Sequence, residues 1–248
     1  MDKISAVLIV KNEANNIARC LKSLSGVDEI VVLDTGSTDA TENICVGFGA
    51  KVYHLDKWEG FGKAKQKAVD LASFDWIISI DADEEISPEL QKELQTLKHN
   101  SFENSAWRIK RRSYYLGKPI HFCGWQNDAP VRLFNRKKGS FNTKIVHEGI
   151  QTSQPIKKCK HYLYHYTYPT REVLFTKMRF YAELSAKQLY EKGKKSNEFS
   201  AWIRGICKFF KMYIFQLGFL DGAKGFLLCK NSAWGIWYRY HLLGKMQK

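Results

Sequence analysis

Residues 76–84, WIISIDADE, decide how this chain is interpreted, because an apolar run ends there in closely spaced carboxylates. The apolar part predicts a buried strand. In extended backbone successive side chains alternate faces, so Asp81 and Asp83 are expected on one side of the strand's carboxyl end. Open α/β sheets bind ligands at that edge. Such a pair suits Mg²⁺ or Mn²⁺, which keeps coordination positions for the phosphates of a nucleotide.

Three more strands are predicted before this stretch, each followed by a helical segment. They cover Ile4–Val10, Glu29–Asp34 and Lys51–Leu55. This alternation predicts a mostly parallel α/β sheet flanked by helices. Ser87 followed by Pro88 predicts the N-terminus of a further helix.

The loops after these strands carry the unusual polar residues. They are residues 11–13 (KNE), 34–39 (DTGSTD) and 58–66 (WEGFGKAKQ). Because the carboxyl ends of parallel strands share one sheet edge, we expect the three loops to gather at one nucleotide site. Asp39 and Glu42 also form an expected capping pair for the following helix.

Three motifs resemble glycosyltransferase family 2, the inverting nucleotide-sugar enzymes with a GT-A fold. They are residues 7–13 (VLIVKNE), 34–41 (DTGSTDAT) and 81–84 (DADE), and the likeness covers roughly residues 1–150. Within the family the chain is most similar to lipopolysaccharide core glucosyltransferases of the heptose-modifying type. The motifs that carry this closer likeness are Gly60-Phe61-Gly62 with Lys65-Gln66, and residues 131–134 followed by 146–148.

The resemblance implies which residues bind the nucleotide. Backbone around Val10 to Asn12 and the side chain of Asp34 would hold the base, uracil, and Glu13 would lie near the ribose. Lys65 stands where relatives often have arginine. If it contacts the nucleotide, a point charge replaces a planar bidentate donor.

The resemblance also implies the metal ligands. Asp81 would contact the ribose or the metal, Asp83 would be the principal metal ligand, and His165 a further one. In a strand over residues 161–166, His161 and His165 share a face. The alternative for His165 is a packed, hydrogen-bonded histidine.

Sugar transfer needs a base for the proton of the acceptor hydroxyl. His147 and Glu148 offer an imidazole and a carboxylate together, and the resemblance implies an acidic residue in this region. We therefore select Glu148 as the base, with His147 orienting it or touching phosphate. The alternative is an exposed loop glutamate. The basic and aromatic segment 107–135 is expected to contact the acceptor, or else to form the amphipathic surface of a mixed sheet.

The chain is strongly basic, with a formal net charge of +14. Beyond about Phe199, helical stretches combine many aromatic residues with eight lysines and arginines against the single acid Asp221. This mixture favours association with an anionic membrane surface, with the helices lying in the interface. The alternative is a helical subdomain that packs its aromatics on the core. Glycines near residues 218–225 predict a hairpin around residues 220–222.

We expect two parts: a GT-A nucleotide-sugar-binding and catalytic domain over residues 1–168, and a helical, basic region over residues 169–248. Six scattered cysteines without metal-type spacing are expected to be reduced thiols. Since Met1-Asp2-Lys3 leads directly into the first strand, we expect a cytoplasmic protein, peripheral on the inner face of the cytoplasmic membrane.

Three other classes of protein share some of these sequence features. A nucleotidyltransferase would share the α/β design, but its glycine-rich, arginine-containing loop after strand one is missing. A haloacid-type phosphatase would carry its Asp-x-Asp in the opening strand. A nucleic-acid-binding protein would explain the charge, but the acidic strand end would repel phosphate unless a cation intervened.

The resemblance therefore implies metal-assisted, inverting transfer of a hexose, foremost glucose from UDP-glucose. The acceptor would be a hydroxyl of a lipopolysaccharide core, such as an inner-core heptose, or of another glycolipid. The expected partners are this donor, this acceptor and the anionic membrane surface, with no nucleic acid.

Overall fold

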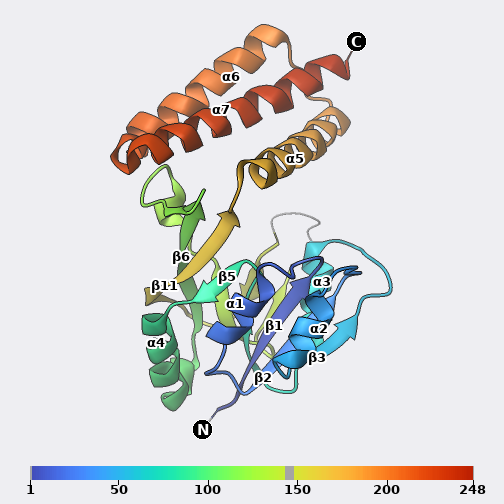
Figure 1. Ribbon diagram of the computed structural model, residues 1–248, viewed down its shortest axis with the longest axis vertical. Helices are drawn as coiled ribbons and strands as arrows, with labels where there is room; N and C mark the ends of the chain where they lie inside the picture. Colours follow the sequence, from blue (N-terminus) through green and yellow to red (C-terminus); the bar gives the residue numbers. More distant parts are fainter. Residues whose placement is uncertain (1, 143–147, 248) are drawn as a thin grey trace. The chain divides into compact units, whose positions relative to one another are not determined.

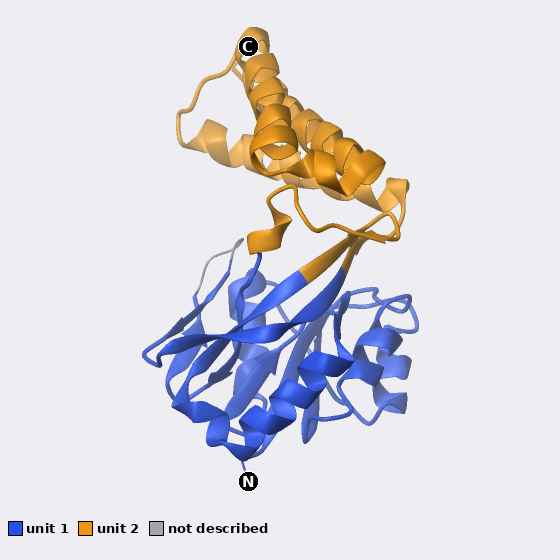
Figure 2. Cartoon of the chain, turned by 90° about the vertical axis from the view of Figure 1, so that its left-hand side faces the viewer, with its two compact units in different colours: residues 1–111, 128–165 blue, residues 112–127, 166–248 orange. Residues whose placement is uncertain are grey.

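The computed structural model describes residues 2–142 and 148–247. These residues form two compact units, which Figure 2 draws in different colours. Unit 1 comprises residues 1–111 and 128–165, and unit 2 comprises residues 112–127 and 166–248. The expected single division after residue 168 differs from this in two respects: segment 112–127 groups with the C-terminal helices, and the later boundary lies after residue 165.

Unit 1 is built on a mixed sheet with strand order β3-β2-β1-β4-β8-β6-β11-β5, as Figure 1 shows in part. β1 pairs in parallel with β2 and β4, β2 pairs in parallel with β3, and β8 pairs antiparallel with both β4 and β6. The strands are β1 (Ile4–Val10), β2 (Glu29–Asp34), β3 (Lys51–His54), β4 (Trp76–Ser79), β5 (Glu84–Ile86), β6 (Ala106–Tyr115), β8 (Val131–Asn135) and β11 (Ile156–Tyr168). β9 (Gly139–Phe141) and β10 (Ile150–Thr152) form a separate antiparallel pair.

Helices cover both faces of the parallel part of the sheet. They are α1 (Ile17–Ser23), α2 (Thr41–Gly47), α3 (Phe61–Asp70) and α4 (Pro88–His99), with a short 3₁₀ turn η1 (Ser101–Asn104) after α4. Side chains of β1 alternate between the two faces: Leu8 packs in the cluster that contains Leu21 of α1, and Val7 in the one that contains Ala68 of α3. Burial on both faces explains why these strands read as continuous apolar runs.

The expected α/β class, the four strands and the helices after them are confirmed in unit 1. The side chain of Ser87 accepts a hydrogen bond from Leu90 N, as expected for an N-cap. The expected capping pair of α2 is wrong in detail, because the N-cap is Ala40 and Asp39 instead accepts from the backbone N–H of Thr41.

Part of the expected loop 58–66 is a helix. α3 begins at Phe61, directly after Gly60, whose φ of +107° favours a residue without a side chain. Lys65 consequently lies on a helix, and its residue is only 7% exposed.

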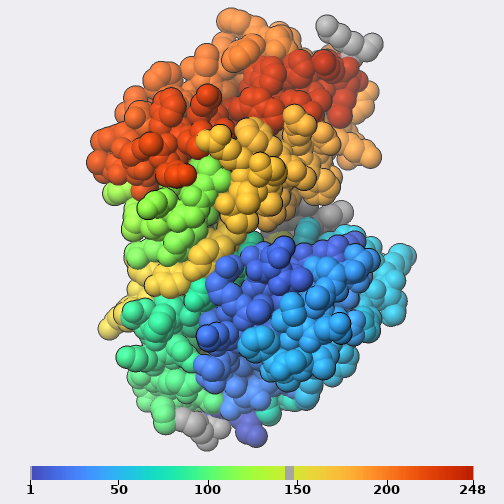
Figure 3. Space-filling view, in the orientation of Figure 1, coloured from blue at the N-terminus to red at the C-terminus, as the bar shows by residue number. Residues whose placement is uncertain are grey.

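Unit 2 is mainly helical. Its helices are α5 (Arg171–Glu191), α6 (Glu198–Phe210) and α7 (Gly222–Lys245), with a π-helical turn η3 (Lys211–Phe215) and a 3₁₀ turn η4 (Gly218–Asp221) between the last two. Segment 112–127 adds β7 (Lys118–Pro119), which pairs with the end of β6, and the 3₁₀ turn η2 (Trp125–Asn127). The expected hairpin around residues 220–222 is confirmed, because α6 and α7 pack along each other. In the space-filling view, α5, α6 and α7 form a continuous surface on the face shown (Figure 3).

The segment 112–127 is tied to the hairpin by specific contacts inside unit 2. The carboxylate of Asp221 accepts hydrogen bonds from the backbone N–H groups of His121 (3.0 Å) and Phe122 (2.8 Å). Asn231 of α7 donates to the hydroxyl of Tyr115 at 2.6 Å. These bonds explain why the segment groups with the helical unit, although strands of the sheet precede and follow it in the sequence.

Many aromatic residues of the hairpin are exposed within unit 2. Phe199 is 75% exposed, Trp202 54% and Phe215 81%. Among the described residues, no helix combines the length and apolar character that a membrane crossing requires.

Candidate functional site

The carboxyl ends of β1, β2 and β4 lie at one edge of the sheet in unit 1. This follows from their parallel pairing, in which Val10 is opposite Asp34 and Val7 is opposite Ser79. The candidate residues that follow these strands are therefore delivered to the same edge.

The loops after β1 and β2 are fastened to each other. Asn12, at a positive φ of 54°, donates its backbone N–H to Ser37 Oγ (3.0 Å) and accepts from Thr38 N (2.7 Å). Glu13 N donates to Thr41 Oγ1 at 2.8 Å, and the carboxylate of Glu13 accepts from Asn16. The expected base- and ribose-binding loops are thus held in one arrangement by their own polar groups.

Asp34 ends β2 and is almost fully buried, at 3% exposure. Its carboxylate accepts hydrogen bonds from the backbone N–H of Ser37 (3.1 Å) and from the Ser37 hydroxyl (2.6 Å). The Val10 carbonyl accepts from Thr35 N at 2.9 Å. Both residues expected to hold the base therefore lie in the same corner, with fixed orientations.

The backbone of the Asp-x-Asp motif differs from the expectation. β4 ends at Ser79, and residues 81–84 form a turn in which Glu84 N donates to the Asp81 carbonyl at 2.9 Å. The Glu84 carboxylate in turn accepts from Asp81 N at 2.9 Å. Strand alternation therefore does not orient Asp81 and Asp83, and the derivation of their direction from a strand was wrong.

Asp81 is the centre of a network of charges. Its Oδ1 lies 2.8 Å from Lys65 Nζ, and its Oδ2 lies 2.5 Å from the guanidinium of Arg132. Lys65 also contacts Glu148 Oε1 at 2.9 Å, so one buried lysine bridges two candidate carboxylates. Burial alone would raise the pKa of Asp81, but Arg132 and Lys65 outweigh it and hold that pKa well below its usual range.

Arg132 and Glu84 extend this network into the core. Both residues are buried, and the Arg132 guanidinium pairs with the Glu84 carboxylate as well as with Asp81. Arg111 adds a second cation 3.3 Å from Glu84 and also pairs with Asp128. Burial raises the pKa of Glu84, and Arg132 only partly offsets this effect. Buried charges are tolerated because each has an opposite partner.

Asp83 and His165, the expected metal ligands, lie next to each other. The distance from Asp83 Oδ1 to His165 Nε2 is 3.6 Å, and the side chains are 17% and 16% exposed. His165 lies on β11 directly opposite Glu84 of β5, and this pairing brings the histidine to the turn formed by residues 81–84. A carboxylate and an imidazole are donors that Mn²⁺ or Mg²⁺ accepts in proteins, so this pair fits such an ion.

A second group of possible ligands lies at Asp34, Glu42 and His54. Their ligand atoms lie within 4.8 Å of one another, whereas Asp83 and His165 form only a pair among the described residues. Both groups offer the one or two carboxylates that a nucleotide-bound ion takes from a protein, so this number does not separate them. They differ in that the Asp34 carboxylate already accepts hydrogen bonds from Ser37.

Sequence reasoning missed the structural role of Glu84 and Arg132. Arg132 was expected among the residues that contact the acceptor, but its guanidinium is buried against Asp81 and Glu84. A charged residue inside the apolar strand VRLFN was the available signal, since arginine is rarely buried unless it is paired. Glu148, the expected base, forms an ion pair with Lys65. His147, which was expected to orient it or to touch phosphate, lies outside the described residues.

Comparison with known proteins adds an independent finding. The family model described as "Glycosyl transferase family 2" matches residues 5–143. An "Uncharacterized glycosyltransferase" of Rickettsia felis is 37% identical over 241 residues, which cover 92% of this chain and 84% of that protein. The "Lipopolysaccharide core biosynthesis glycosyltransferase LpsC" of Rhizobium meliloti is 29% identical over 236 residues, which cover 93% and 87% of the two chains.

Among solved structures, the chain is similar to glucosyl-3-phosphoglycerate synthase from Mycobacterium tuberculosis in complex with Mn²⁺, UDP and glucosyl-3-phosphoglycerate. The identity is 29%, the match covers 46% of this chain and 44% of that chain, and the TM-score is 0.37. A likeness of this extent carries no argument about the site of this chain.

The buried network generates a stability prediction. Arg132→Met should lower the free energy of unfolding by about 3–5 kcal/mol, because it leaves the Glu84 charge buried with less compensation. Urea denaturation monitored by tryptophan fluorescence measures this change. Adding Glu84→Gln to Arg132→Met should recover part of the loss. Arg108→Met, an exposed position on β6, serves as the control. Equal stability of Arg132→Met and the wild type would contradict the network.

Proposed function

The chain belongs to glycosyl transferase family 2 and is a glycosyltransferase, and from this premise we propose its donor, acceptor and catalytic residues. The proposed reaction is inverting transfer of a hexose from a UDP-sugar, foremost UDP-glucose. The proposed acceptor is a hydroxyl of a lipopolysaccharide core or of another glycolipid. The observation that carries the proposal is the bridge that Lys65 makes between Asp81 and Glu148, beside the Asp83–His165 pair.

Nucleotide binding is assigned to the corner between β1 and β2. Asp34 and the backbone from Val10 to Asn12 would contact the base, and Glu13 would lie near the ribose. The hydrogen bonds that fasten these two loops support this assignment, because a preorganised site loses less entropy on binding. Asp81 would face the ribose, with Lys65 and Arg132 balancing its charge.

Asp83 and His165 would hold Mg²⁺ or Mn²⁺. When bound, such an ion neutralises negative charge on the departing diphosphate. The division of labour between the two aspartates is supported by the contacts of Asp81, whose two oxygens each already face a cation. Asp83, which lies beside the imidazole of His165, is therefore the carboxylate that we assign to the metal.

Glu148 is proposed as the base. The acceptor hydroxyl attacks the anomeric carbon as the bond to the diphosphate breaks, and Glu148 takes up the hydroxyl proton. Its ion pair with Lys65 supports the role in two ways: it holds the carboxylate in place, and it links the base to the residue beside the nucleotide.

The acceptor class is supported by the relative LpsC, whose name refers to lipopolysaccharide core biosynthesis. A glycolipid acceptor lies in a membrane, so we also propose that unit 2 associates with an anionic membrane surface, on the cytoplasmic side. Unit 2 has 17 lysines and arginines against five aspartates and glutamates, so it carries most of the net positive charge of the chain.

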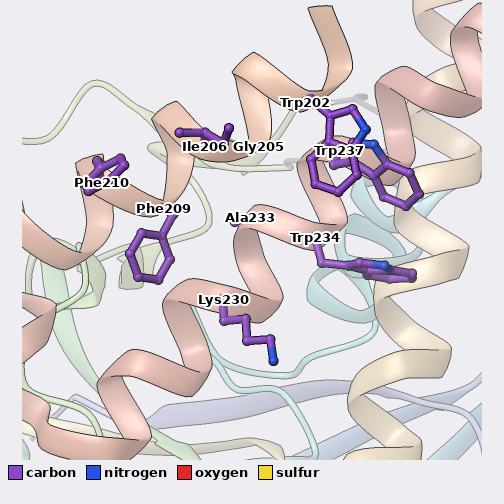
Figure 4. A pocket seen from close by; sticks show the side chains of 9 residues that line it. All are labelled: Trp202, Gly205, Ile206, Phe209, Phe210, Lys230, Ala233, Trp234 and Trp237. Atoms are coloured by element: carbon purple, nitrogen blue, oxygen red, sulfur yellow. The ribbon is translucent and has the colours of Figure 1, made fainter. Parts of the chain in front are cut away.

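A groove of about 500 Å³ between α6 and α7 supports the proposed membrane association of unit 2. It is lined by apolar and aromatic side chains, with the exposed Lys230 at its margin, as Figure 4 shows. Aromatic residues flanked by lysines are the composition of interfacial helices, and positive charge complements anionic lipid headgroups.

Asp83→Asn should abolish the part of donor binding that depends on metal. Isothermal titration of UDP- and GDP-sugars with and without MnCl₂ measures this, and we expect a loss on the order of 10–100-fold for the UDP-sugar. Glu42→Gln tests the other ligand cluster and should leave the titration unchanged. Unaltered Mn²⁺-dependent binding in Asp83→Asn would rule out the proposed metal site.

Glu148→Gln should bind the donor with an unchanged Kd but lose about 10²–10⁴-fold in turnover, because the proton acceptor is gone and the shape is kept. Release of UDP in the presence of a heptose-containing core oligosaccharide reports turnover. The exposed Glu103→Gln is the matched control. Near-normal turnover of Glu148→Gln would remove this residue as the base.

Phe215→Ser should weaken binding to phosphatidylglycerol vesicles by about tenfold or more, since burying a phenylalanine side chain contributes roughly 1.5–3 kcal/mol. Vesicle sedimentation measures this partition. Phe48→Ser, an exposed aromatic position of unit 1, should have no effect. Equal vesicle binding of both variants, or wild-type binding that does not depend on lipid charge, would refute the proposed association of unit 2 with an anionic membrane.

A further inference from the structure

An open cavity of about 290 Å³ lies in unit 2. Side chains from α5, α6 and α7 surround it, together with Trp125 of η2 and Tyr168 at the end of β11. None of the residues proposed to take part in sugar transfer lines it. Its volume is at the small end of the range for small-molecule sites.

The described lining of this cavity is positively charged. It includes Lys208 of α6 and Arg239 of α7 but no aspartate or glutamate. Within the described part of the chain, neither cation forms an ion pair with a carboxylate, in contrast to the buried cations of unit 1. Lys208 and Arg239 are both partly buried, so two like charges that share one cavity repel each other and lose part of their water without gaining an anion.

Arg239 provides a second observation. Its Nε is buried and has no hydrogen-bond partner among the described atoms. A buried donor that stays unsatisfied is destabilising, and more so when the group is charged. A few other described side chains share this feature, but Arg239 is the one among them that lines this cavity, and a missing ligand is one explanation for such a group.

The surroundings of Lys208 agree with this. Burial lowers the pKa of Lys208, and the nearby positive charges of Lys211 and Arg239 lower it further. The charged lysine is therefore disfavoured by its environment, and an anion in the cavity would reverse that effect.

The remaining lining indicates what else the ligand carries. Trp125, Tyr168 and Tyr181 contribute aromatic rings, and the first two rings lie 6.4 Å apart between centroids. Ser232 and Asn231 contribute polar groups, and Asn231 already donates to Tyr115. Aromatic faces and a few polar groups suit a small body such as a sugar ring attached to the anion.

We propose that this cavity binds a phosphate ester, with Arg239 and Lys208 contacting the phosphate oxygens. A phosphomonoester carries up to two negative charges and a phosphodiester carries one, and arginine and lysine are the side chains that proteins use for phosphate. The inference goes beyond the proposed transfer reaction, since it assigns a second anion site in the other unit. The ester can belong to a phosphorylated sugar or to a phospholipid headgroup.

The test is isothermal titration of the full chain with glucose 6-phosphate, glucose, inorganic phosphate and phosphatidylglycerol vesicles, at one ionic strength. We expect saturable binding of glucose 6-phosphate, weaker binding of inorganic phosphate and none of glucose. Binding of the vesicles that depends on Arg239, without binding of the sugar phosphate, would instead assign the ester to a lipid.

Variants separate this site from the transfer site, which would also attract phosphate. Arg239→Gln and Lys208→Gln should each weaken binding by about tenfold or more, because a charge-assisted hydrogen bond is lost. Lys230→Gln, at an exposed lysine of α7 that lines the apolar groove and not this cavity, should change the binding of glucose 6-phosphate by no more than about twofold. Asp83→Asn should still bind glucose 6-phosphate at this cavity. The test of this cavity therefore does not depend on whether the proposed metal site is correct.

Folding of the variants is checked by thermal unfolding without phosphate. Because Arg239→Gln removes a like-charge repulsion, its Tm should equal or exceed that of the wild type. Two results would overturn the proposal: no saturable binding of any phosphate ester up to about 10 mM, or equal binding in Arg239→Gln, Lys208→Gln and the wild type.

Discussion

The pairing of Asp81 with Lys65 and Arg132 is the constraint on which the rest of the site depends. Asp81, Glu84 and Glu148 are three carboxylates gathered at one sheet edge, and without cations they would repel one another and any diphosphate. Lys65, Arg132 and Arg111 supply matching positive charge from α3, β8 and β6. The network therefore balances charge inside unit 1, and it holds Asp81 and Glu148 at a single lysine.

This balance determines how the two aspartates of the motif differ. Asp81 is committed to two cations of the protein, so it contributes little free negative charge to a metal. Asp83 follows it by two residues, in the turn closed by Glu84, and lies beside His165 of β11. Because of this turn, the two aspartates of one short motif have different surroundings. Asp81 belongs to the buried network, and Asp83 is the proposed metal ligand.

Much of unit 1 was predictable because its signals are local. The bounds of β1 and β2 and the N-cap at Ser87 follow from apolar runs and from single residues of known preference. The network was not predictable, since Arg132 and Asp81 are 51 residues apart and no local pattern names their partner. The same holds for Asp221, which anchors the segment 112–127 across about a hundred residues. The turn at Asp81 depends on the Glu84 side chain, which a strand pattern does not reveal.

The central claim is that Asp83 and His165 seat the ion that accompanies the donor, while Asp81 stays with Lys65 and Arg132. The most direct measurement is an anomalous difference map, at the manganese edge, from crystals grown with MnCl₂ and UDP. The account predicts a peak bonded to Asp83 and His165, with Asp81 still paired to both cations. A peak at Asp34, Glu42 and His54 instead, or Asp81 released from Arg132 to bind the metal, would contradict it.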